Sequence, residues 1–75
     1  MEKIYRADYD RKGTNVQEDS WYFWAEDDKQ ALNLAKAHGL LGIDYGDIGH
    51  VELELVQLYE VEDNEFCSEK RLVWF

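Results

Sequence analysis

The sequence has no proline, one cysteine and few basic residues, and each scarcity excludes a class of protein. The single thiol, Cys67, allows neither an intramolecular disulfide nor a zinc finger, so packing or a partner must stabilise the fold. No apolar run approaches the roughly 18 residues of a membrane-spanning helix, and the N-terminus lacks the apolar core of a secretory signal. We therefore expect a soluble cytoplasmic protein with no membrane partner.

What the chain does contain is enough apolar mass for one small domain. Hydrophobic residues make up 45% of its 75 residues and aromatic residues 15%, which excludes intrinsic disorder. A chain of this length supports one thin core rather than two. We expect a single domain over residues 1–75.

Acidic residues outnumber basic ones by 17 to 8, and this net charge of −9 argues against direct nucleic-acid binding, because phosphates would be repelled. The excess lies entirely within residues 37–69, which hold nine acids and no lysine or arginine. Those acids are Asp44, Asp47, Glu52, Glu54, Glu60, Glu62, Asp63, Glu65 and Glu69. Such patterning serves either solubility or recognition of a basic partner.

The first part of the chain predicts a hairpin followed by a helix. Residues 2–9 and 16–25 are rich in aromatic and branched side chains, and the polar stretch 10–15 between them has the composition of a turn. Asp27 is placed to cap a helix, and Gln30 stands three positions later as in a capping box. We expect two paired strands and a helix that begins here.

The helix is expected to end near His38, with Gly39 as its left-handed C-terminal residue. Ala31 and Ala35 recur on one helical face, and their small side chains would let the helix approach a sheet closely. The helix therefore covers one face of the expected sheet.

The second part of the chain predicts a loop over 40–49 and two further strands. Strict alternation begins at Val51, but its phase is lost downstream, which indicates a bulge or a second buried face near Gln57. Residues 71–75 predict the last strand. The fold class is therefore α+β: a two-layer ββαββ domain with a four-stranded, mainly antiparallel sheet in the order 2-1-3-4 and one helix on one face.

One short helix shields only one side of such a sheet, so the other side needs an explanation. Large apolar side chains alternate onto both faces of the second and last strands. We assign four residues to a homodimer or second-face interface: Tyr22, Trp24, Val73 and Phe75. The alternatives are a foreign partner on the same face, or half-exposed aromatics in a small domain.

The sequence offers little for catalysis or metal binding. Asp44, Asp47, His50 and Glu52 are the densest candidate ligands, but their spacing lacks the ladder of an EF-hand, so we expect no metal and no cofactor.

The candidate catalytic side chains have simpler explanations. His38 is expected to be a cap or a partly buried core residue, and Cys67, among acids, an inert thiol. Ser20 and Ser68 have no neighbouring histidine in the sequence. We therefore expect that the protein is not an enzyme.

With catalysis and metal binding set aside, the remaining candidate function is recognition of a partner by acidic side chains that imitate the phosphates of a nucleic acid. Residues two apart on a strand face lie roughly 6.6 Å from each other, near the spacing of successive phosphates along a nucleic-acid strand. We assign partner binding to eight acids: Asp44, Asp47, Glu52, Glu54, Glu60, Glu62, Asp63 and Glu65. The partner would be a protein with a basic groove; the alternative is that these acids form a solvated strand face.

The segment Trp24–Ala31, continuing to Ala35 and His38, resembles the strand-into-helix segment of small phage and mobile-element proteins. With its acidity and aromatic-rich layout, the chain resembles anti-CRISPR proteins and related phage inhibitors that mimic nucleic acid. The resemblance implies a non-enzymatic inhibitor of a host defence or nucleic-acid-processing protein, acting in the bacterial cytoplasm. The rival hypothesis is a small homodimeric accessory or regulatory module.

Overall fold

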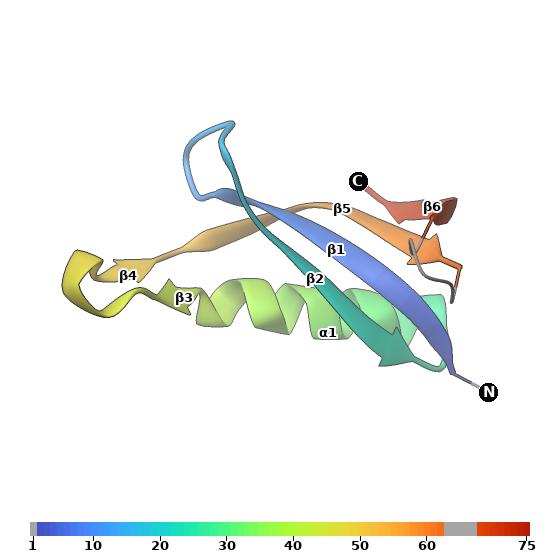
Figure 1. Ribbon diagram of the computed structural model, residues 1–75. Helices are drawn as coiled ribbons and strands as arrows, with labels where there is room; N and C mark the ends of the chain where they lie inside the picture. The colour runs from blue at the N-terminus through green and yellow to red at the C-terminus, as the bar shows by residue number, and fades with distance from the viewer. Residues whose placement is uncertain (1, 63–67) are drawn as a thin grey trace.

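The computed structural model describes residues 2–62 and 68–75 and has an α+β fold, with one helix against a four-stranded antiparallel sheet (Figure 1). This class was predicted and is confirmed. The elements in chain order are β1 (Lys3–Arg11), β2 (Gln17–Ala25), α1 (Asp28–Leu41), β3 (Ile43–Asp44), the 3-10 helix η1 (Gly46–Ile48), β4 (His50–Val51), β5 (Leu53–Val61) and β6 (Glu69–Trp74). No helix in the described ranges combines the length and the apolar character that crossing a bilayer requires.

The main sheet has the order β2-β1-β5-β6, and all its neighbouring strands are antiparallel. This differs from the predicted order 2-1-3-4, because two short strands precede the third long one. β3 and β4 pair with each other in a separate two-stranded sheet. β3 lies in the stretch 40–49, where the sequence predicts a loop, since a two-residue strand carries too little alternation to be recognised. Val51 of β4 is the residue at which the sequence predicts the start of the third strand.

The core lies between α1 and the sheet, and alternation along β1 decides which side chains enter it. Tyr5, Ala7 and Tyr9 are fully buried beneath the helix, whereas the residues between them point to the opposite face. Ala31 and Ala35 of α1 are also fully buried, so the predicted close approach of the helix is confirmed. The Tyr9 hydroxyl donates a 2.6 Å hydrogen bond to the backbone oxygen of Ala35, which fixes the helix on the sheet.

The helix begins where predicted and ends later than predicted. The Asp27 side chain caps it by accepting a 2.8 Å hydrogen bond from the backbone N–H of Gln30. Its end near His38, with Gly39 as the terminator, is wrong. Gly39 is buried within the helix, where an added Cβ would lie 3.1 Å from Cε1 of Tyr9, so glycine serves close packing there.

Gly42 ends the helix instead, with φ of 67°. A Cβ atom added to it would lie 2.5 Å from the backbone oxygen of Val51 and 2.7 Å from Nε2 of His50. Any other residue would therefore collide with β4 as well as adopt a strained backbone. This position allows the chain to turn from α1 directly into the β3–β4 hairpin.

β5 contains the bulge that the sequence predicted near Gln57. Asp8 of β1 pairs with Gln57 and the next residue, Tyr9, pairs with Leu55, which leaves Val56 as an extra residue. Side chains before Val56 and after it therefore follow opposite phases. Leu53 and Leu55 face the helix in the first half of β5, and Leu58 and Glu60 face it in the second.

Candidate binding surface

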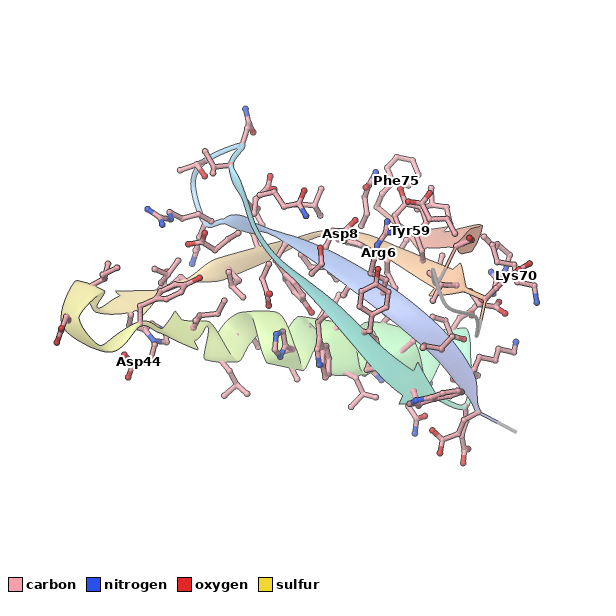
Figure 2. All side chains as sticks on the ribbon, viewed as in Figure 1. Arg6, Asp8, Asp44, Tyr59, Lys70 and Phe75 are labelled. Carbon is pink, nitrogen blue, oxygen red and sulfur yellow. The ribbon has the colours of Figure 1, made fainter. Side chains whose placement is uncertain are left out.

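We call the side of the main sheet that lies away from α1 the open face, and Figure 2 shows Arg6, Asp8 and Tyr59 on that side. Its membership follows from the strand register and from the buried positions between its residues. The open face includes Ile4, Arg6, Asp8 and Asp10 of β1, Ser20, Tyr22 and Trp24 of β2, and Glu54, Gln57, Tyr59 and the buried Val61 of β5. Within the described ranges, no second helix or sheet covers it.

Arg6 stands at the centre of this face between two tyrosines. Tyr22 of β2 and Tyr59 of β5 are its direct partners in register, and the Arg6 guanidinium lies 4.7 Å from the centroid of the Tyr59 ring. Its nitrogen atoms also lie 3.1 Å from Oδ1 of Asp8 and 2.7 Å from Oε1 of Glu69. Burial alone would lower the pKa of Arg6, but Glu69 and Asp8 outweigh it and raise the pKa above its ordinary value.

Of the four residues assigned to a second-face interface, three are exposed. Tyr22 and Trp24 are 46% and 50% exposed on the open face, and Phe75 is 81% exposed at the end of the chain. Val73 differs, because it is half-buried and packs against the core. Its assignment to an exposed interface is therefore corrected.

Two acids on the open face make no ion pair with a residue that the structure describes. Asp10 and Glu54 are direct partners in the register of β1 and β5, so their side chains lie on the same face. Neither makes a hydrogen bond or an ion pair with any residue of the described ranges. Two carboxylates opposite each other repel, and this repulsion is relieved when a cation approaches them.

The neighbouring end of the molecule holds three of the predicted acids. Asp44 and Asp47 lie in the β3–η1–β4 hairpin, where Oδ1 of Asp44 accepts a hydrogen bond from the backbone N–H of Gly46. Glu52 links this hairpin to β5, and its carboxylate lies 3.5 Å from Nζ of Lys12 in an exposed ion pair. Such exposed pairs contribute little and are readily exchanged for other cations.

Glu60 is different, because it is only 6% exposed and faces the helix side. Arg71 donates a 2.9 Å hydrogen bond to Oε1 of Glu60 and a 2.8 Å bond to Oδ1 of Asp28, while Nζ of Lys70 lies 3.4 Å from Oε2 of Glu60. The hydrogen bonds from Arg71 lower the pKa of both carboxyl groups below their ordinary values. The Tyr5 hydroxyl completes this cluster with a bond to Asp28.

The expected continuous row of acids is therefore not formed by the described residues. Asp44 lies at one end of the elongated molecule, and Lys70, beside Glu60, lies at the other (Figure 2). The bulge at Val56 separates the phase of Glu54 from that of Glu60. Glu62 is exposed after β5, and the assigned residues Asp63 and Glu65 lie outside the described ranges.

Two side chains that were weighed as catalytic candidates, His38 and Ser20, are held by contacts with other side chains. The His38 ring stacks on Trp21 at 4.2 Å, and Nε2 lies 3.4 Å from Oδ2 of Asp19, which places it as the partly buried residue that was expected. Ser20 donates a 2.9 Å hydrogen bond to Asp8. Among residues 2–62 and 68–75, no three His, Cys, Asp or Glu side chains gather closely enough to hold a metal ion.

A comparison of the chain with protein-family models, with curated proteins and with solved structures finds no match. The candidate surface therefore rests on the geometry of this molecule. Asp10 and Arg6 are not among the residues that the sequence predicts for this surface. Alternation in the first strand was the available signal, since it places Ile4, Arg6, Asp8 and Asp10 on one face.

Proposed function

We propose that the protein is a non-enzymatic acidic binding protein whose open face docks on a basic, nucleic-acid-binding surface of another protein. The observation that carries this proposal is that Asp10 and Glu54, which make no ion pair with a described residue, share the open face with the exposed rings of Tyr22 and Trp24. Acids provide attraction to a basic groove, and amphipathic aromatics supply contact area at low entropic cost. Both components occur on one uncovered face.

The acidic part of this surface is smaller than the row of eight residues inferred from the sequence. It comprises Asp10 and Glu54 on the open face, with Asp44, Asp47 and Glu52 at the adjoining end. Glu60 is excluded from it by burial and by its bonds to Arg71. The surface supports occupation of a basic site better than detailed imitation of a phosphate backbone.

The partner that fits this surface best is a host protein that handles nucleic acid, such as a defence or nucleic-acid-processing protein. Net charge of −9 attracts a basic groove and repels nucleic acid itself. With its resemblance to small acidic phage inhibitors, the chain would act as a phage or mobile-element inhibitor in the bacterial cytoplasm. Binding through charge predicts fast association that weakens as salt increases.

The test is capture of proteins from a bacterial lysate on the immobilised chain, followed by release with added DNA or RNA. The double variant Asp10→Lys and Glu54→Lys should reduce nucleic-acid-releasable capture at least about tenfold, because it replaces attraction by repulsion. The control variant Glu2→Lys and Glu26→Lys changes the net charge equally, at exposed positions beside the strand ends that carry Ile4 and Trp24 and away from the acidic pair, and should reduce capture much less than the double variant does. Equal capture by both variants, or capture that nucleic acid does not displace, would contradict the proposal.

A homodimer is the second candidate, and one observation favours it. Tyr22 and Trp24 lie on the edge strand β2, where a second copy would find both apolar area and an unpaired strand edge. Sedimentation at high salt distinguishes the two functions, since salt weakens charge-driven docking and strengthens apolar association. A dimer that Trp24→Ser dissociates would favour the second candidate.

A further inference from the structure

The outer edge of β5 is covered along only part of its length. β1 pairs with β5 on one side from Leu53 to Val61, but β6 pairs on the other side only from Leu58 to Val61 (Figure 1). In the described ranges, no strand pairs with the outer edge of residues 53–57. An unpaired strand edge offers a row of backbone donors and acceptors to another extended chain.

An apolar groove of about 250 Å³ adjoins this free edge on the helix side. Leu53 and Leu55 of β5 form one wall, and Lys36, Gly39 and Leu40 of α1 form the other. Leu40 is 88% exposed, so an apolar side chain stands in water at the rim. A strand added to the edge would place every second side chain over this groove.

The charges around the edge favour one kind of occupant. Side chains of an added strand that point away from the groove would lie near Glu54, with Asp10 one strand beyond, and neither acid has a counter-charge in the described ranges. Basic residues fit there, while Lys36 disfavours them in the groove. A second copy fits poorly, because each chain carries a net charge of −9 and would bring its own Glu54 to this edge.

We propose that residues 53–57 and the adjoining groove bind an extended segment of a partner in which apolar and basic residues alternate, by strand addition in line with β6. Backbone pairing supplies the affinity, and the groove and the two acids select the side chains. The inference rests on the proposed function in that the segment belongs to the basic partner. It adds a second site, at the junction of the open face and the helix layer.

The test uses a synthetic peptide of about six residues, a usual strand length, in which valine and lysine alternate and both ends are blocked. Amide hydrogen exchange of the whole chain, followed by NMR, should slow at residues 53–57 when this peptide is added. A peptide of the same composition with its lysines in one block and its valines in another should not slow it. Equal effects of the two peptides, or protection only along β2, would overturn the inference.

Two adjacent leucines provide a matched pair of variants. Leu40 lines the groove, whereas Leu41, 74% exposed, does not. Leu40→Lys should raise the Kd of the alternating peptide at least about tenfold, because it removes an apolar contact and adds a like charge. Leu41→Lys should change it less than about twofold. Equal weakening by both variants would overturn the groove as the binding site.

Failure of the strand-addition site can be distinguished from failure of the proposed function. The double variant Tyr22→Ser and Trp24→Ser alters the opposite edge of the sheet and should leave protection of residues 53–57 by the peptide unchanged. If lysate capture depends on Asp10 and Glu54 but the peptide gives no protection, only the strand-addition site is overturned. Protection that rises with protein concentration without any peptide would overturn it in favour of a second copy.

Discussion

The two halves of β5 carry similar sequences, but their acidic side chains lie on opposite faces of the sheet. Glu54 stands between two leucines and points to the open face, where it makes no ion pair with a described residue, whereas Glu60 stands between Tyr59 and Val61 and is buried against Arg71. The bulge at Val56 between them reverses the phase of the strand. One extra residue, rather than composition, therefore decides which acids are available to a partner.

The same comparison holds for the ends of the molecule. At one end, the acidic side chain of Glu60 is paired with two basic residues, Arg71 and Lys70. Arg71 also bonds to Asp28 and so joins the start of the helix to β5. At the opposite end, Asp44 and Asp47 make no ion pair with a residue of the described ranges. Among the described acids of residues 37–69, Asp44, Asp47 and Glu54 make no ion pair with a described residue, and all three lie toward the hairpin end of the molecule.

Deletion of Val56 should have the largest effect on the difference between the two halves of β5. Without the extra residue, the two halves of β5 cannot both direct their leucines to the helix. Either Leu53 and Leu55 together, or Leu58 alone, must then leave the core. The free energy of unfolding should fall by at least about 4 kcal/mol, because losing a buried leucine costs roughly 2–5 kcal/mol. Urea unfolding followed by circular dichroism measures the change.

Val56→Ala is the control for this deletion, since it keeps the residue count and hence the bulge. It should cost about 1 kcal/mol or less, in the range of a partly buried truncation. A deletion variant that unfolds within about 1 kcal/mol of the wild type would show that the bulge does not determine the phase of β5.

The same substitution, glutamate to glutamine, should have different effects on stability in the two halves of β5. Glu60→Gln should lower the free energy of unfolding by about 1–2 kcal/mol, because it weakens charge-assisted hydrogen bonds to a buried group. Glu54→Gln should leave it unchanged or raise it by a few tenths of a kcal/mol, since it removes repulsion from Asp10. Urea midpoints of the two variants provide the measurement, and equal destabilisation would contradict the assigned roles.

A smaller effect is expected in the dependence of stability on pH. Arg71 holds the pKa of Glu60 below its ordinary value, so the stabilisation is present above that ordinary value and is lost as the pH falls toward the lowered one. The difference in free energy of unfolding between the wild type and Glu60→Gln should therefore shrink between about pH 6 and pH 3. Urea titrations at each pH test this, and a difference that grows on acidification would contradict it.

Local signals in the sequence predicted the parts of the fold that depend on near neighbours. The cap at Asp27, the buried alanines of α1 and the bulge near Gln57 all follow from patterns within a few residues. Gly39 was misplaced because its role depends on Tyr9, which is distant in the sequence and packs against it. A glycine that permits close packing has the same local pattern as one that ends a helix.

The candidate site was harder to predict, because it depends on pairs that are distant along the chain. Arg71 reaches Asp28, 43 positions away, and Arg6 reaches Glu69, 63 positions away, and no local pattern indicates either pair. The exposed rings of Tyr22 and Trp24 were foreseen from alternation in a single strand. Asp10 and Glu54 required the register between two strands, which the sequence does not supply.

Gly42 has a consequence for the ancestry of this fold. Its positive φ and the closeness of its Cβ position to the backbone of Val51 leave no room for substitution while the hairpin stays against the helix end. Surface carboxylates, in contrast, can drift to new positions without disturbing the core. Distant homologues should therefore be recognisable by an invariant glycine directly after the helix, even where their acidic character has been lost.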